Sequence, residues 1–139
     1  MKTILFACVH NAGRSQMAAA LFNAIADPAK AHAISAGTSP GQRVHPEVVD
    51  VMREEGLDLS SARPQKLTSD LARGVQVLVT MGCGDACPVV PGTRIEDWPL
   101  PDPKGAPLDE VRRIRDEIRN RVRNLAEREG VTRGSAMQR

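Results

Sequence analysis

The sequence is poor in aromatic residues and has no long apolar run. Its 139 residues include one Trp, two Phe and no Tyr, so the aromatic platforms on which single-stranded nucleic acids stack are missing. The formal net charge of +2 is too small to indicate a nucleic-acid ligand. No run of about 18 apolar residues occurs, so no membrane-spanning helix is predicted. The composition therefore favours a single globular domain with neither nucleic acid nor membrane as a partner.

Cysteine is also scarce. The three cysteines are an odd number, which does not suit the disulfide framework of a small secreted protein. A reducing compartment suits them better, with the thiols available for chemistry and any disulfide transient. We therefore expect a cytoplasmic protein.

The stretch from Phe6 to Ser15 combines a cysteine, an arginine and a predicted helix start. A short apolar strand leads into Cys8, and Arg14 opens a helical pattern six residues later. A loop of this kind collects backbone N–H groups around a tetrahedral anion, at the positive end of the helix dipole. Cys8 as a thiolate is then the candidate nucleophile, and the alternative is a small buried structural thiol. The candidate oxyanion-binding residues are Val9, His10, Asn11, Ala12, Gly13, Arg14 and Ser15.

Strand and helix patterns alternate along the chain, without repeats or a linker. Strands are expected at 2–7, 31–37, 75–81 and 95–98, and helices at 15–26, 46–55, 66–74 and 108–129. This order predicts a three-layer α/β fold, with about four parallel strands and helices on both faces of the sheet. Ligands of such folds bind at the carboxyl ends of the strands, where Cys8 is placed.

The boundaries of the domain follow from the last helix. The helix is expected to end near residue 129 and the residues after it show no periodicity, so we predict one domain over 1–129 and a flexible tail over 130–139. The same helix carries many arginines interleaved with acidic residues, which indicates a solvated face of mixed charge.

Cys83 and Cys87 form a second thiol cluster directly after the third predicted strand. Residues four apart approach within about 6 Å in a helical turn, which permits a disulfide. A zinc site is the alternative, but it needs four donors and no further Cys or His pair is close in sequence. A redox pair at the same sheet edge as Cys8 is the favoured interpretation.

Asp102 precedes Pro103 and is the candidate carboxylate for the site. As a general acid it would protonate a leaving oxygen. Its alternative is a plain turn aspartate.

Several motifs together resemble the low-molecular-weight protein tyrosine phosphatase family, and more closely its arsenate reductase branch. The resemblance covers residue 2 to about residue 127. It rests on Cys-Val-His-Asn-Ala-Gly-Arg-Ser-Gln-Met from Cys8, on Ser-Ala-Gly-Thr from Ser35, on Thr-Met-Gly-Cys-Gly-Asp-Ala-Cys-Pro from Thr80, and on Asp-Trp from Asp97 followed by Asp-Pro from Asp102.

The resemblance implies a role for each of these residues. Cys8 is then the nucleophile, Arg14 the oxyanion clamp and Asp102 the general acid, while Cys83 and Cys87 form the redox relay. Arsenate is the implied substrate and arsenite the product, with phosphate or sulfate as mimics of arsenate and with no cofactor or metal ion. Thioredoxin, or mycothiol with a mycoredoxin, is the implied reductant.

The sequence departs from the thioredoxin-coupled members in three places. Three residues separate Cys83 from Cys87 where six are usual, and Gly13 stands where many carry a further cysteine. Ala19 stands where a glutamate often helps to hold potassium, so no potassium ion is predicted. Because the loop with Cys8 resembles that of actinobacterial members, some of which use mycothiol, the reductant stays open.

Two other functions share the loop. A tyrosine phosphatase would use the same cysteine, arginine and aspartate, but it usually has an aromatic cleft and needs no cysteine pair. A non-catalytic oxyanion sensor would bind without turnover, and the sequence offers no DNA-reading element for it. Arsenate reduction with weak phosphatase activity is the expectation.

Overall fold

The computed structural model describes residues 1–82 and 92–133. In chain order the elements are β1 (Lys2–Cys8), α1 (Arg14–Ile25), β2 (Ala31–Gly37), α2 (Pro46–Arg53), α3 (Ser69–Ala72), β3 (Val77–Thr80), β4 (Arg94–Asp97) and α4 (Leu108–Glu129).

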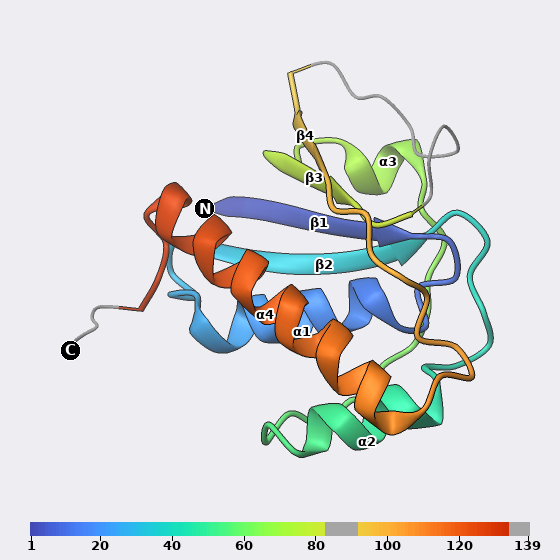
Figure 1. Cartoon of the computed structure of the whole chain (residues 1–139). Coiled ribbons are helices and arrows are strands. Elements are labelled where there is room, and N and C mark those ends of the chain that lie inside the picture. The colour runs from blue at the N-terminus through green and yellow to red at the C-terminus, as the bar shows by residue number, and fades with distance from the viewer. Residues whose placement is uncertain (83–91, 134–139) are drawn as a thin grey trace.

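The four strands form one parallel sheet in the order β2-β1-β3-β4. Helices α1, α2 and α4 lie on one side of the sheet, and the short helix α3 lies on the other (Figure 1). The three-layer α/β prediction with helices on both faces is therefore confirmed. The register pairs Cys8 with Gly37, and Ala7 with Thr80, so the carboxyl ends of the strands meet at one edge.

The continuous apolar run of β1 results from burial on both faces. Ile4, Phe6 and Cys8 face the core under α1, α2 and α4. Leu5 and Ala7 face the smaller core under α3. Successive side chains of a strand point to opposite faces, so a strand between two apolar layers needs apolar residues at every position.

Helix α3 is shorter than predicted, because the residues before it are extended and form backbone hydrogen bonds with the end of β2. Leu67 donates its backbone N–H to the carbonyl of Gly37 at 2.7 Å, and Gly37 donates to the carbonyl of Gln65 at 2.9 Å. The helix starts only after Thr68, whose side chain accepts the N–H of Leu71 at 3.0 Å. The extended segment before α3 is thus held against the end of β2, beside Cys8.

An ion-paired cluster joins α2 to α4. Arg115 is 7% exposed and donates to the Val51 carbonyl and to Glu54 Oε1, both at 2.8 Å. Hydrogen bonds from Arg112 and then Arg115 lower the pKa of Glu54 from its ordinary 4.5 to about 2. The prediction of a solvated arginine face is therefore wrong for Arg115, which joins two helices.

The predicted tail begins with residues that are packed on the fold. After Gly130 in the left-handed conformation, Val131 is 3% exposed. Asp27 donates its N–H to the Val131 carbonyl at 2.7 Å, and Arg133 donates its N–H to the Ile25 carbonyl at 2.9 Å. Residues 130–133 thus pack on the end of α1, and residues 134–139 lie outside the described residues.

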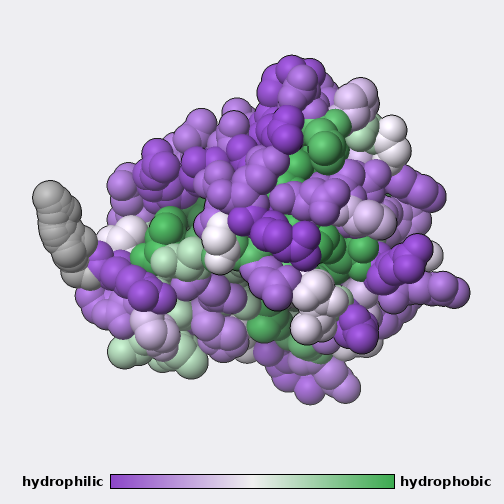
Figure 2. Space-filling view, turned by 90° about the horizontal axis from the view of Figure 1, so that it is seen from below, coloured by the Kyte–Doolittle hydropathy of each residue, from purple (hydrophilic) through white to green (hydrophobic). Residues whose placement is uncertain are grey.

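The helical side of the molecule is mostly hydrophilic, with separate small hydrophobic areas (Figure 2). Over the parts of the chain that the structure describes, no helix is long and apolar enough to cross a membrane.

Candidate active site

Cys8 ends β1 and lies at the base of a loop that leads into α1. The residue is 2% exposed, and its Sγ lies 2.9 Å from Ser15 Oγ. Gly13 precedes α1 and offers no side-chain cap, so N–H groups of the first helical turn stay available to a bound anion. The structure places the Cys8 thiol beside the N-terminus of α1, as the sequence predicted.

The backbone of the loop is held from outside by residues that follow β2. The N–H groups of Thr38, Ser39, Gly41 and His45 donate to the carbonyls of Cys8, Val9, His10 and Ala12 at distances of 3.2, 2.8, 2.9 and 2.9 Å respectively. None of the peptide bonds in the described residues is cis, so each of these peptide units directs its N–H opposite to its carbonyl. The N–H groups turned to the inner side of the loop are therefore those of Val9, His10, Asn11 and Gly13.

Asn11 holds the loop in shape with its side chain. Asn11 has a φ of 52°, and no other non-glycine residue in the described part of the chain has a positive φ. Asn tolerates this conformation better than most residues. Its Oδ1 accepts the N–H of Gln65 at 2.9 Å and an N–H of Gln16 at 3.2 Å. Its Nδ2 donates to Ser15 Oγ at 2.7 Å.

These hydrogen bonds give the Ser15 hydroxyl a direction. Because Ser15 Oγ accepts from Asn11, its own proton is free to point at Cys8 Sγ. A hydroxyl that donates to sulfur stabilises the thiolate, which is the nucleophilic form of cysteine. Asn11, Ser15 and Cys8 thus form one chain of hydrogen bonds that ends on the sulfur.

Arg14 follows the loop as the first residue of α1 and is 7% exposed. Its Nη1 donates to the carbonyl of Leu100 at 2.9 Å, and its Nη2 lies 4.0 Å from Asp102 Oδ2. A Cβ atom on Gly82 would lie 2.6 Å from Nη1. The guanidinium is therefore held between the end of β3 and the segment after β4.

Asp102 is the half-exposed carboxylate of the site. Its side chain is 45% exposed, and its Oδ1 accepts the N–H of Lys104 at 3.0 Å. Pro103 rests on the loop, because its Cγ would lie 2.8 Å from a Cβ on Gly13. The structure thus brings together Cys8, Arg14, Ser15 and Asp102, four of the residues that the sequence singled out.

Cys83 and Cys87 lie outside the described residues. The chain is described up to Gly82, which touches Arg14, so Cys83 is the next residue after a contact of the site. In residues 1–82 and 92–133, no group of three or more His, Cys, Asp or Glu side chains gathers as a metal site.

Gln16, Gly37 and Gln65 belong to the site but were not predicted from the sequence. A Cβ on Gly37 would lie 2.6 Å from the carbonyl oxygen of Val9, so only glycine allows the loop to fold back on β2. Gly37 is the glycine of the Ser-Ala-Gly-Thr motif, so the sequence already contained a sign of this close contact. Gln16 and Gln65 act on Asn11 through hydrogen bonds that no local pattern encodes.

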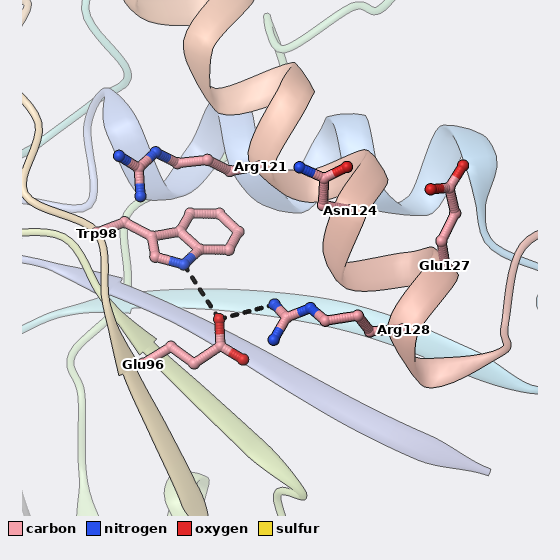
Figure 3. Close-up of a pocket in the computed structure, with 6 residues that line it drawn as sticks. All are labelled: Glu96, Trp98, Arg121, Asn124, Glu127 and Arg128. Atoms are coloured by element: carbon pink, nitrogen blue, oxygen red, sulfur yellow. Dashed lines mark hydrogen bonds and ion pairs between the residues drawn. The ribbon is translucent and has the colours of Figure 1, made fainter.

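A cleft of about 540 Å³ lies between β4 and α4, away from the loop with Cys8. In Figure 3, Glu96 lies between the indole of Trp98 and the guanidinium of Arg128. Glu96 Oε1 accepts from Trp98 Nε1 at 3.2 Å and from Arg128 at 3.0 Å. Burial alone would raise the pKa of Glu96, but the hydrogen bonds from Arg128 and Trp98 outweigh it and lower that pKa. The half-buried carboxylate of Glu96 in this cleft is thus already paired within the protein.

Comparison with known proteins gives one consistent family. Residues 3–135 match the low molecular weight phosphotyrosine protein phosphatase family. The arsenate reductase of Staphylococcus aureus (strain Newman) is 35% identical over 132 residues, which cover 91% of this chain and 98% of that protein.

Solved structures agree with this match. The thioredoxin-dependent arsenate reductase of Corynebacterium glutamicum is 39% identical with a TM-score of 0.82, and the match covers 94% of this chain but 62% of that chain. The low molecular weight protein tyrosine phosphatase of T. tengcongensis is 25% identical with a TM-score of 0.80, covering 92% of this chain and 99% of that one. The chain therefore belongs to the low molecular weight phosphotyrosine protein phosphatase family, and within that family it is similar to the arsenate reductases.

Proposed function

We propose that this protein is an arsenate reductase that uses Cys8 as its nucleophile. The observation that carries the proposal is the loop itself: one buried cysteine, 2.9 Å from a serine hydroxyl, below an arginine and beside inward backbone N–H groups. The similarity to arsenate reductases of two bacteria supports the choice of arsenate over other tetrahedral oxyanions.

In the first step, arsenate binds to the N–H groups of the loop and to Arg14, whose planar guanidinium suits two oxygens of the anion. The Cys8 thiolate attacks arsenic, and an oxygen of arsenate leaves as water with a proton from Asp102. Arsenic is still As(V) at this point. Asp102 lies close enough to Arg14 to serve the same ligand.

In the second step, the thiolate of Cys83 attacks the sulfur of Cys8. A Cys8–Cys83 disulfide forms, the bond between sulfur and arsenic breaks, and its electron pair stays on arsenic, which leaves as arsenite. Two thiols are oxidised and As(V) is reduced to As(III), so the electrons balance. Cys87 then attacks Cys83 and frees Cys8, which leaves a Cys83–Cys87 disulfide for an external thiol system.

Thioredoxin is the reductant that this proposal favours, since the relative from Corynebacterium glutamicum is thioredoxin-dependent. Mycothiol with a mycoredoxin is the second candidate, because Cys83 and Cys87 are unusually close in sequence. A reducing, cytoplasmic location and binding of phosphate or sulfate as arsenate mimics belong to the same proposal.

A single-turnover experiment tests the relay without any external reductant. The reduced wild-type protein should form about one arsenite per chain and lose two titratable thiols. The Cys87→Ser variant should accumulate a Cys8–Cys83 disulfide that mass spectrometry detects. If the wild type forms arsenite only when a thiol is added, the relay is wrong and the mycothiol route is left.

Phosphatase activity is the second candidate function, since the low molecular weight phosphatase of T. tengcongensis has the same fold. The geometry of Cys8, Arg14 and Asp102 supports attack on phosphorus as well as on arsenic. We expect weak hydrolysis of small aryl phosphates, because Trp98 is 5% exposed and no Tyr is present to wall an aromatic cleft.

A further inference from the structure

A recess of about 280 Å³ adjoins the catalytic loop on its β2 side. This volume lies near the lower end for small-ligand pockets, which begin at about 300 Å³. The sheet order places the segment after β2 and the segment after β3 on opposite sides of β1. Most of the lining of the recess therefore comes from the β2 side of Cys8, and one residue comes from the segment after β4. It is lined by His10, Ala12, Gly41, Gln42, Arg43, His45 and Lys104.

Every ionisable side chain that lines the recess is basic. These are His10, Arg43, His45 and Lys104, and no carboxylate is among the lining residues. Arg43 and Lys104 are exposed, and neither forms an ion pair within the described part of the chain. On α4, by contrast, Arg112 and Arg119 each pair with carboxylates. The recess thus concentrates positive charge that the fold itself does not neutralise.

The recess and the anion-binding loop share a wall. His10 and Ala12 belong to both. A Cβ on Gly13 would lie 3.5 Å from a ring carbon of His45 and 2.8 Å from Pro103 Cγ, so both segments that border the recess also border the loop. The recess therefore lies directly beside the loop.

We propose that the recess binds a carboxylate of a ligand whose phosphoryl or arsenyl group occupies the loop. The planar guanidinium of Arg43 matches a carboxylate with two hydrogen bonds, and the ammonium of Lys104 adds a third donor. A neutral group gains none of the charge attraction, and a cation is repelled. The protein thus selects doubly anionic ligands. This inference rests on the anion-binding role of the loop under the proposed function.

Binding of non-hydrolysable phosphonates tests this selectivity. Titration calorimetry on the reduced wild-type protein compares 3- and 4-carboxybenzylphosphonate with the neutral carbamoyl analogues of the same shape. We expect at least one carboxylate isomer to bind about fivefold more tightly than its carbamoyl analogue at low salt, with a smaller ratio at high salt. In Arg43→Gln, and further in Arg43→Gln combined with Lys104→Gln, the ratio should fall toward one.

Lys30→Gln provides the matched control, because it removes one exposed positive charge at the opposite end of β2 and should keep the wild-type ratio. Equal affinity of the wild type for all four phosphonates, with phosphate still bound, would overturn the recess alone. An unchanged ratio in the double variant would also overturn it. If neither phosphate nor any phosphonate binds, the anion-binding role of the loop fails, and the proposed function fails with it.

Discussion

Gly82 allows Arg14 to take its place over the catalytic loop. A Cβ atom at residue 82 would lie 2.6 Å from Arg14 Nη1 and 3.4 Å from its Cζ, and the backbone of Gly82 has a φ of 100° that side chains disfavour. Gly82 follows β3 by two residues and directly precedes Cys83. The residue proposed to form a disulfide with Cys8 therefore directly follows the glycine that sets the position of the Arg14 guanidinium.

Replacing Gly82 by Ala should weaken anion binding by displacing the guanidinium. The loss of charge-assisted hydrogen bonds from Arg14 predicts a phosphate affinity about tenfold lower or worse, measured by calorimetry. Gly74→Ala is the matched control, since Gly74 has a φ of 81° and nothing within 4 Å of its Cβ position. Both variants should lose about 1–2 kcal/mol of stability through backbone strain. Equal loss of phosphate affinity in both would refute a specific effect on Arg14.

Asn11 should be needed for its side chain more than for its backbone conformation. Asn11→Gly accepts the φ of 52° but loses the hydrogen bonds to Ser15 and Gln65. Asn11→Ala loses the same hydrogen bonds and in addition disfavours the positive φ. We expect Asn11→Ala to unfold at a lower temperature than Asn11→Gly, because the positive φ costs alanine about 1–2 kcal/mol. Turnover should fall strongly in both variants. Full turnover in Asn11→Gly would show that the hydrogen-bond chain to Cys8 is dispensable.

Asp102→Asn should slow aryl phosphate hydrolysis by about a hundredfold, since general acid catalysis typically contributes that much or more. The expected loss is in kcat for phenyl phosphate, whose leaving group needs a proton, and is smaller for p-nitrophenyl phosphate, which leaves more readily. Asp50→Asn, an exposed change on α2, serves as the control. A rate equal to that of the wild type for both esters would remove Asp102 from the acid role.

The pairing of Glu54 with α4 predicts a loss of stability in acid. Hydrogen bonds from Arg112 and Arg115 lower the pKa of Glu54 from 4.5 to about 2 in the folded protein. The unfolded chain therefore takes up this proton first, and the stabilisation is present above about pH 4.5 and lost as the pH falls toward 2. Denaturant unfolding between pH 5 and 2 should show a shallower pH dependence for Glu54→Gln than for the wild type.

Glu127→Gln is the control for this measurement. Glu127 is an exposed carboxylate of α4, and the Glu127→Gln variant should show the same pH dependence of unfolding as the wild type. An identical pH dependence in Glu54→Gln and the wild type would show that the ion pairs of Glu54 with Arg112 and Arg115 do not persist in solution.

Much of the fold was predictable from local patterns, because each pattern had one cause. The apolar run before Cys8 is a strand buried on two faces, and the helix predicted over 108–129 has the bounds of α4. The second helix was expected to end at residue 55, directly before Gly56, which has a φ of 77°, but α2 already ends at Arg53.

The rest depends on contacts between distant segments. Arg115 carries the same charge as its exposed neighbours, and only the approach of α2 makes it a buried link. The catalytic loop likewise gets its shape from the residues after β2 and from Gln65. Sequence spacing placed Cys8, Arg14 and Ser15 together, but it contained nothing about the partners that orient Asn11 or about Gly82.

The most direct test of the account is steady-state arsenite formation from arsenate by the wild type and by Cys8→Ser. Each protein is assayed with thioredoxin, thioredoxin reductase and NADPH, and separately with mycothiol and a mycoredoxin. We predict arsenite from the wild type with at least one of the two systems, and none above background from Cys8→Ser. Arsenite formation by Cys8→Ser at the wild-type rate would contradict it, as would a wild type that hydrolyses aryl phosphates but forms no arsenite with either system.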